Sequence, residues 1–335
     1  MIRSARRLAG ILRAGEWWGH KLPPALAVFY GTLFLSRHAV SAAAPSALAL
    51  LVAVAAAAAF AGTVNDLADR ADDAAAGKPN RMAGRSPMEA ALLVGVPLAI
   101  GLAFAIGWRS DLPLALAYAG SWIAFSLYSL PPFRLKRLGF AGVVADAAGA
   151  HLFPSLTALL LAAQAAGQGL DIWWTASVAS WSFAYGIRGI LWHQLLDSDN
   201  DRRAGIATLA LRVSPAWAAR LATHIVFPIE AAALAAMLLR LGSLLPPIFL
   251  LLYLLLLAAL RIRTVIVASE RRWAMALQDY DELLLPVAIL CAATLVHPLD
   301  ALILLAQLAL FPRRPLRILV RLGSLVRPAF PRRIE

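Results

Sequence analysis

Charge is scarce in this sequence of 335 residues, and cysteine is nearly absent. Only 15% of the residues are charged, whereas soluble domains carry about a quarter. Hydrophobic residues make up 61% of the chain, and the mean hydropathy is +0.72. These values exclude an ordinary soluble domain and indicate a polytopic α-helical membrane protein. The single cysteine, Cys291, excludes an intrachain disulfide, and its apolar surroundings favour a small buried hydrophobe.

Hydrophobic segments recur along the chain, and a bilayer-spanning helix needs about 20 mostly apolar residues. His20 and Lys21 make the first segment weak, and residues 297–300 interrupt the last one. We predict an all-α membrane protein of about nine transmembrane helices. It forms one domain over 1–335, with a basic N-terminal arm (1–15) and a basic C-terminal tail (312–335). The nine segments are roughly 20–36, 39–64, 89–108, 112–132, 142–166, 172–192, 214–239, 241–260 and 283–311.

Acidic residues are fewer than basic ones, 19 against 31, and the basic residues are concentrated in the N-terminal arm and in alternate loops. The positive-inside rule therefore predicts that the N-terminus and these loops are cytoplasmic. The arginine-rich tail conflicts with nine spans unless the last segment is broken or re-entrant. The net charge of +12 then reflects topology and attraction to anionic membrane lipid, and nothing indicates nucleic acid. The high content of Ala, Arg and Leu suits a GC-rich bacterial genome, and hence a bacterial inner membrane.

Seven of the 19 acidic residues lie in two short windows, 66–73 and 197–201, both in predicted cytoplasmic loops. Within each window the spacing of three or four residues places side chains on one face of a continuing helix. One interpretation is a solvated loop paired with neighbouring arginines. Two matching clusters favour a Mg²⁺ site instead, because Mg²⁺ uses one or two carboxylates together with substrate phosphates. The candidate ligands are Asn65, Asp66, Asp69, Asp73, Asp197 and Asp201, with Asp199 ranked lower.

Basic residues stand next to these clusters in two Pro-containing segments. GKPNR (77–81) follows the first cluster and supplies Lys78 and Arg81, while YSLPPFRLKRLG (128–139) supplies Arg134 and Lys136. They could reach the phosphates that the metal holds, although positive-inside topology alone would also place basic residues here. Lys78 and Arg134 are the stronger candidates, because a proline-fixed turn would hold each in position.

Together, NDLADRADD (65–73), DSDND (197–201), GKPNR and YSLPPFRLKRLG resemble the UbiA superfamily of intramembrane prenyltransferases, over about residues 10–260. The resemblance implies a nine-helix bundle around a central cavity, capped on the cytoplasmic side by the motif loops. In that family both acidic motifs bind Mg²⁺, which holds the diphosphate of a polyprenyl donor. It thus implies the six metal ligands named above, four of which are also catalytic (Asp69, Asp73, Asp197 and Asp201), and diphosphate contacts from Lys78, Arg81, Arg134 and Lys136, with Tyr128 near the reacting carbon.

The chain departs from the family pattern before the second motif. His193 lies four residues ahead of Asp197 on the same helical face, and Ile190 stands near the place where quinone-pathway members have a tyrosine. His193 is a candidate general base, diphosphate contact or acceptor contact, or an ordinary hydrogen-bonding residue. Arg188 is a candidate contact for the diphosphate or for an anionic acceptor group. Asp146 and His151 lie within a predicted span, where an ionisable residue is a functional candidate by default.

The segment LRAGEWWGHKLPP (12–24) precedes the first span, where the superfamily often places acceptor contacts, so Arg13 and Trp17 are the candidates. This segment also loosely resembles RPxQWxKN, found in members that transfer phosphoribose to a polyprenyl phosphate. The metal residues do not discriminate between these activities, because both use a diphosphate donor.

The leading hypothesis is a Mg²⁺-dependent transferase that moves a polyprenyl group from an isoprenyl diphosphate to an unknown aromatic or other lipophilic acceptor. Phosphoribosyl transfer and cyclisation of the prenyl chain remain alternatives. A cation transporter is disfavoured, because transporters place such charges near the bilayer midplane. An allylic cation requires a dry pocket and is stabilised by aromatic faces. The candidate aromatic residues are Trp122, Phe125, Trp181, Phe183 and Tyr185.

Overall fold

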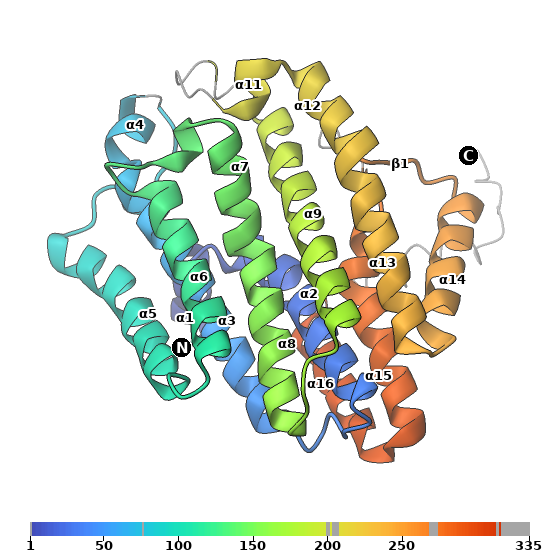
Figure 1. Ribbon diagram of the computed structural model, residues 1–335. Helices are drawn as coiled ribbons and strands as arrows, with labels where there is room; N and C mark the ends of the chain where they lie inside the picture. Colours follow the sequence, from blue (N-terminus) through green and yellow to red (C-terminus); the bar gives the residue numbers. More distant parts are fainter. Residues whose placement is uncertain are drawn as a thin grey trace, which may run out of the picture.

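The structure is a computed structural model, which describes residues 2–75, 77–198, 202, 208–267, 274–312 and 315, the side chains of 2–6 excepted. Almost all of its regular structure is helical (Figure 1). Within these residues one short parallel pair joins β1 (Thr264–Val265) to β2 (Ala274–Met275). The all-α prediction is therefore confirmed apart from this pair.

The long helices lie side by side as a bundle, and the short helices α4 and α11 lie apart from each other at the same end of it (Figure 1). The elements of the first half are α1 (Ile2–Ile11), α2 (Ala14–Leu35), α3 (Ala44–Ala68), α4 (Arg70–Ala75), α5 (Pro87–Gly107), α6 (Leu112–Ser129), η1 (Leu135–Arg137), α7 (Phe140–Ala147), η2 (Ala148–Leu152) and α8 (Phe153–Ala166). Those of the second half are α9 (Ile172–Leu196), α11 (Leu209–Val213), α12 (Pro215–Leu221), η3 (Ala222–Val226), α13 (Phe227–Leu241), α14 (Leu245–Ala259), η4 (Tyr280–Leu284), α15 (Leu285–Val296), η5 (Pro298–Asp300) and α16 (Ala301–Leu310).

Five helical stretches of the described chain are long and apolar enough to cross a membrane. They are α3, α5, α6, the continuous stretch Phe140–Ala166 and the continuous stretch Pro215–Leu241. All nine predicted segments are occupied by helices, but the last is divided between α15 and α16 at residues 297–300. The count of nine spans stays a prediction, whereas the predicted break in the last segment is present.

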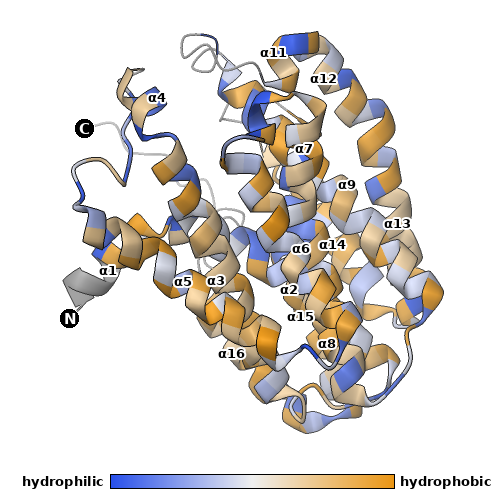
Figure 2. Ribbon diagram, turned by 60° about the vertical axis from the view of Figure 1, so that its left-hand side comes forward, coloured by the Kyte–Doolittle hydropathy of each residue, from blue (hydrophilic) through white to orange (hydrophobic). Residues whose placement is uncertain are grey.

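Helix α2 lies at the centre of the bundle, although its sequence made it the weakest predicted span. Every residue from Leu22 to Leu33 is buried, and the helix packs against α3, α8 and α15. By contrast, α5 buries only Ala90, Pro97 and Gly101, and it shows an apolar surface at the edge of the bundle (Figure 2). The apolar part of α2 thus lies inside the protein, while α5 faces outward, as expected when lipid is the solvent.

Three helices widen into a π turn at the same place relative to a proline. The π turns η2, η3 and η4 end two residues before Pro154, Pro228 and Pro286 respectively. Proline lacks an N–H, and its ring clashes with the carbonyl four residues earlier, so the chain relaxes into a wider turn. Two of these turns place His151 and Glu282 in the interior of the bundle.

Candidate active site

Asp69 of the first acidic motif and Asp197 of the second occupy equivalent positions, each at the C-terminal end of a long helix. Asp69 caps α3 and donates its amide to the Asn65 carbonyl at 3.0 Å, and Asp197 caps α9 and donates its amide to the His193 carbonyl at 3.0 Å. A carboxylate at a helix C-terminus is opposed by the helix dipole, which is negative at that end. Both motifs therefore favour a cation nearby.

Side chains of the loop after α6 supply cations to the first motif. Arg134 donates from Nη2 to Asp69 Oδ1 at 2.7 Å and to Asp72 Oδ2 at 2.9 Å. Lys136 donates to Asp69 and also to Asn65 Oδ1 at 3.0 Å. Arg134 reaches this position because its backbone is left-handed, with φ at 41°. The loop after α6 thus lies against the first motif, and the predicted diphosphate contacts of Arg134 and Lys136 stay a prediction.

Two ionisable groups of this cluster have shifted pKa values. Burial lowers the pKa of the Lys136 ammonium, and the neighbouring Asp69 carboxylate offsets part of this effect. At Asp72, slight burial acts to raise the pKa, but hydrogen bonds from Arg134 and Arg137 outweigh it and lower the pKa. The lowered pKa of Asp72 favours its charged form, whereas burial works against the charge of Lys136, which depends on the neighbouring carboxylate.

Asp66 forms a second group with residues from the start of α2. Arg13 Nη1 donates to Asp66 Oδ1 at 3.2 Å, and both Arg13 and Arg81 also bind Glu16, at 2.6 Å each. Asp66 is only 6% exposed, yet among the described residues its Oδ2 atom has no hydrogen-bond partner, and Arg81 Nη1 lies 3.7 Å from it. A buried carboxylate oxygen without a donor is suited to receive a cation from outside the chain.

Asn80 fastens the loop after α4 to the acidic motif. Its Nδ2 donates to the Asp66 carbonyl and to Asp73 Oδ2, both at 2.7 Å. The Lys78 amide donates to the Asp73 carbonyl at 2.8 Å, and the Lys78 side chain is half-buried. Sequence analysis did not single out Asn80, although its place between Lys78 and Arg81 in GKPNR was a signal for it.

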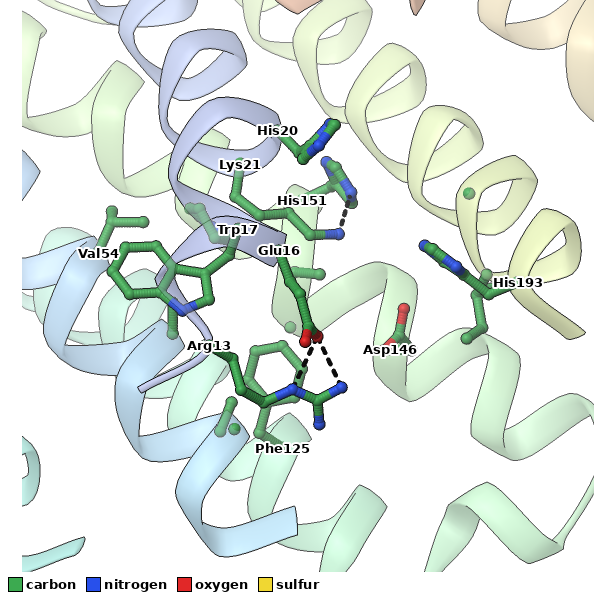
Figure 3. A pocket seen from close by; sticks show the side chains of 18 of the residues that line it. Arg13, Glu16, Trp17, His20, Lys21, Val54, Phe125, Asp146, His151 and His193 are labelled. Carbon is green, nitrogen blue, oxygen red and sulfur yellow. Dashed lines mark hydrogen bonds and ion pairs between the residues drawn. The ribbon is translucent and has the colours of Figure 1, made fainter. Parts of the chain in front are cut away.

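A cavity of about 890 Å³ lies between α2, α3, α6, α7, α8 and α9 (Figure 3). Asp197, His193, Arg13 and Trp17 all line it, and Arg13 connects it to Asp66. One wall is apolar and made largely of small residues, namely Val54, Ala57, Ala58, Ala61 and Gly62 of α3 with Phe125 of α6. The cavity therefore joins a charged end to an apolar interior.

Polar side chains also lie deeper in the cavity. Lys21 Nζ is 2.7 Å from His151 Nε2, and His20 Nδ1 is 2.8 Å from Glu282 Oε2. Tyr185 donates its hydroxyl to Glu282 Oε1 at 2.5 Å. Figure 3 shows the Lys21–His151 contact, with Asp146 and His193 reaching in from the other side of the pocket. Sequence analysis missed Lys21 and Glu282 as site residues, although an ionisable residue inside a predicted span was the signal for Lys21.

The remaining predicted site residues are more distant from the cavity or lie outside the described chain. Arg188 is fully buried, does not line the cavity, and forms a bidentate ion pair with Glu230 of α13. Tyr128 is half-buried on α6, beside Ser129, whose hydroxyl donates to Asn65 at 3.3 Å. Asp199 and Asp201 lie outside the described residues.

Some of the aromatic candidates line the cavity, and others pack elsewhere in the bundle. Phe125 and Tyr185 line the cavity, and so does Ile190. Trp181 stacks on Tyr185 with ring centroids 6.0 Å apart, whereas Trp122 packs against Phe60. Aromatic side chains that line the cavity thus come from α2, α6 and α9.

Within the described residues, no three or more His, Cys, Asp and Glu side chains form a ready metal-binding group. The carboxylates of the first motif are instead interleaved with cations. Glu16, Asp66, Asp69 and Asp72 form ion pairs with Arg13, Arg81, Arg134, Lys136 and Arg137.

The fold and this site define a membrane-embedded helical bundle with a charged cluster at one end of an interior cavity. Residues 22–280 match the family described as the UbiA prenyltransferase family, and the chain belongs to that family. No curated protein matches the chain.

Solved structures of a UbiA homolog from Archaeoglobus fulgidus have the same fold. One, bound to GPP and Mg²⁺, is 19% identical, covers 91% of this chain and 99% of its own, and has a TM-score of 0.58. A second, bound to DMAPP and Mg²⁺, is 19% identical with the same coverage and a TM-score of 0.54. A third, bound to Cd²⁺, is 20% identical, covers 85% and 98%, and has a TM-score of 0.59.

Proposed function

We propose that this protein is a Mg²⁺-dependent prenyltransferase, which moves a polyprenyl group from an isoprenyl diphosphate to an aromatic or other lipophilic acceptor inside the membrane. The observation that carries the proposal is the cluster of interleaved carboxylates and cations beside a cavity that has an apolar wall on α3. The Archaeoglobus fulgidus structures bound to GPP or DMAPP with Mg²⁺ support it.

The residues at the charged end fit a hard divalent cation. Asp66 offers a buried oxygen without a hydrogen-bond donor, and Asn65, Asp69, Asp73 and Asp197 are oxygen ligands of the kind that Mg²⁺ prefers. Mg²⁺ typically takes few protein carboxylates and completes its shell with phosphate oxygens and water. The metal would supply positive charge to the diphosphate as it leaves. Asp201 is proposed as a further ligand by family resemblance.

The side chains of this protein then have separate roles. Arg13, Arg81, Arg134 and Lys136 would bind the diphosphate oxygens, and Lys78 would reach them from its own loop. The alanine-rich wall on α3 would hold the prenyl chain and exclude water from the allylic cation. The faces of Phe125 and Tyr185 would stabilise that cation.

The polar side chains deep in the cavity favour transfer to an acceptor over cyclisation of the donor. Lys21, His151 and Glu282 would be costly around a purely hydrocarbon cyclisation substrate, whereas an acceptor with polar groups can satisfy them. We further propose nine membrane-spanning segments in a single domain of a bacterial inner membrane. The N-terminus and the loops that carry the acidic motifs would be cytoplasmic, with Tyr128 close to the reacting carbon.

The test is release of pyrophosphate by the protein purified in lipid nanodiscs. Reactions contain Mg²⁺ and geranylgeranyl diphosphate with a lipid extract of bacterial membranes, or 5-phosphoribosyl diphosphate with polyprenyl phosphate. We expect Mg²⁺-dependent release from the prenyl donor, reduced about a hundredfold or more in Asp69→Asn and Asp197→Asn. Asp72→Asn is the matched control, since Asp72 also binds Arg134 but stands outside the motif spacing, and it should keep most of the activity.

Release from the sugar diphosphate alone would replace the proposal with phosphoribosyl transfer. A product of donor mass without the pyrophosphate would indicate cyclisation. An equal loss of activity in Asp69→Asn and Asp72→Asn would show that activity depends on the total negative charge at this end of the cavity and not on the motif positions.

A further inference from the structure

His20 and Glu282 form a histidine–carboxylate pair at the wall of the cavity. His20 belongs to α2 and Glu282 to the π turn η4, both line the cavity, and His20 Nδ1 lies 2.8 Å from Glu282 Oε2. The Glu282 side chain is 1% exposed, whereas that of His20, labelled in Figure 3, is 40% exposed. The imidazole is therefore the more open member of the pair, and the carboxylate lies buried behind it.

The contacts of Glu282 fix the tautomer of His20. The Tyr185 hydroxyl donates to Glu282 Oε1 at 2.5 Å, and because a carboxylate can only accept, Oε2 accepts from His20 Nδ1. The amide nitrogen of Gln278 also lies 3.4 Å from Nδ1, but this contact is long, and Nδ1 cannot accept while it donates. The lone pair of the neutral ring therefore lies on Nε2, as in a histidine that a carboxylate holds as a base.

The other two histidines of the cavity are held differently. His151 Nε2 accepts from Lys21 Nζ at 2.7 Å, so its lone pair is already engaged by an ammonium. Among the described residues, no carboxylate forms a hydrogen bond with His193, although Asp146 lies on the same side of the pocket (Figure 3). Of the three, His20 alone combines an orienting carboxylate with an acceptor nitrogen.

His20 is also set back from the charged end of the cavity. It stands six residues beyond Ala14, the first residue of α2, which is about 9 Å along the helix axis. Arg13, which binds Asp66, immediately precedes the helix. A donor with its diphosphate at that end would direct its allylic carbon along this stretch, and the reacting part of an acceptor would lie between that carbon and His20.

We propose that His20, held by Glu282, is the base that takes the proton the acceptor loses during prenyl transfer. The proposal rests on the proposed function, since it names a residue for one step of that reaction. Glu282 is the positioning residue, which stays ionised and stabilises the imidazolium.

The step balances as follows in atoms and electrons. The bond between the donor's allylic carbon and the diphosphate oxygen breaks, and its electron pair leaves with the pyrophosphate. An atom of the acceptor bonds to the allylic carbon through an electron pair of its own. The C–H or O–H bond at that site then breaks, its electron pair stays on the acceptor, and the proton passes to His20 Nε2.

The first experiment measures the prenylated product and pyrophosphate separately, with the protein in lipid nanodiscs. Reactions contain Mg²⁺, labelled geranylgeranyl diphosphate and a lipid extract of bacterial membranes. A positioned base contributes about a hundredfold or more, so His20→Ala should lose that much of its transfer rate, and added imidazole should restore about tenfold of it. Mg²⁺-dependent binding of geranyl diphosphate should be unchanged. His224→Ala is the matched control, since His224 is exposed on η3 and does not line the cavity, and it should transfer normally.

The second experiment tests the role of Glu282 without any substrate. Nitrogen-15 NMR of the protein with labelled histidine should place the hydrogen of His20 on Nδ1, with the resonance assigned by its absence in His20→Ala. Glu282→Gln should give a mixture of tautomers, because an amide can either donate to Nδ1 or accept from it. Its transfer rate should fall about tenfold or more through loss of a hydrogen bond to a charged group.

Transfer that persists in His20→Ala would overturn the proposal, and so would a loss that imidazole leaves unchanged. A hydrogen on Nε2 of His20 in the unmodified protein would overturn it as well. An imidazole-restored loss in His193→Ala, with His20→Ala unaffected, would assign the base to His193 instead. Absence of Mg²⁺-dependent transfer by the unmodified protein would contradict the proposed function, and the tautomer of His20 is measured independently of that result.

Discussion

Glu16 joins the two arginines that lie nearest to Asp66. Its Oε1 accepts from Arg81 at 2.6 Å, and its Oε2 accepts from Arg13 at 2.7 Å. An incoming diphosphate would need the same two guanidinium groups. Glu16 therefore competes with the donor for these guanidinium groups. This single residue sets the affinity of this end of the cavity for anions.

We expect Glu16→Gln to bind inorganic pyrophosphate more tightly than the unmodified protein in the presence of Mg²⁺. The gain should reach about fivefold, because exposed ion pairs of this kind contribute up to about 1 kcal/mol. Titration calorimetry at low and high salt measures it, and the gain should shrink at high salt. Weaker binding in Glu16→Gln would show that Glu16 orders the arginines for the donor rather than competing with it.

At the scale of helices, packing depends on close backbone contact between α7 and α9. Gly186 of α9 faces Ala147 of α7, and a Cβ atom at this glycine would lie 2.9 Å from the Ala147 Cα and carbonyl oxygen. Small residues permit such approach between membrane helices. The contact fixes Asp146, one residue earlier on α7, relative to His193, two turns later on α9.

Gly186→Ala is expected to destabilise the protein by about 1–3 kcal/mol, because backbone atoms must move apart. Gly95→Ala on α5, where no atom lies within 4 Å of the added Cβ, should be neutral or stabilising by up to about 1 kcal/mol through helix propensity. Thermal denaturation in detergent compares the two variants. Equal melting temperatures would mean that α7 and α9 separate without cost.

Much of this element-level arrangement could be predicted from the sequence. Hydrophobic segments predicted the helices. The contacts of Arg134 and Lys136 with Asp69 were not predicted, because these residues are 65 and 67 positions from Asp69 and only the fold brings them together. The contacts of the deep cavity could not be predicted, since His20 and Glu282 are 262 residues apart in sequence and nothing local couples them. The predicted span 142–166 also hid η2, because hydropathy does not record where proline changes the helical register.

Over the whole molecule, the long helices that contribute polar side chains to the cavity are less apolar than the others. Within the described chain, α2 and α9 are long but are less apolar or more charged than the five stretches that could cross a membrane. Both helices supply polar side chains to the cavity, including Lys21 and His193. The molecule therefore places its least apolar long helices around the cavity, whereas α5, one of the two most apolar stretches, is largely exposed toward lipid.

The orientation of the whole bundle is tested with single cysteines in a Cys291→Ala background. Ala83 and Ser110 are exposed at opposite ends of α5, whose 21 residues span about 32 Å. We expect a membrane-impermeant maleimide to label Ser110→Cys in intact cells, and Ala83→Cys only after permeabilisation. The reverse pattern would contradict a cytoplasmic location of the acidic motifs.

The central position of α2 has a consequence for biosynthesis. This helix is synthesised early, whereas its neighbour α15 is synthesised much later. The hydrogen bond from Tyr30 to Gln307 can form only after a further 277 residues have been synthesised. A nascent α2, with Lys21 in it, is a poor substrate for membrane insertion on its own. We therefore expect α2 to reach its final packed position in one of the last steps of assembly, when α15 and α16 enter the bilayer and pack against it.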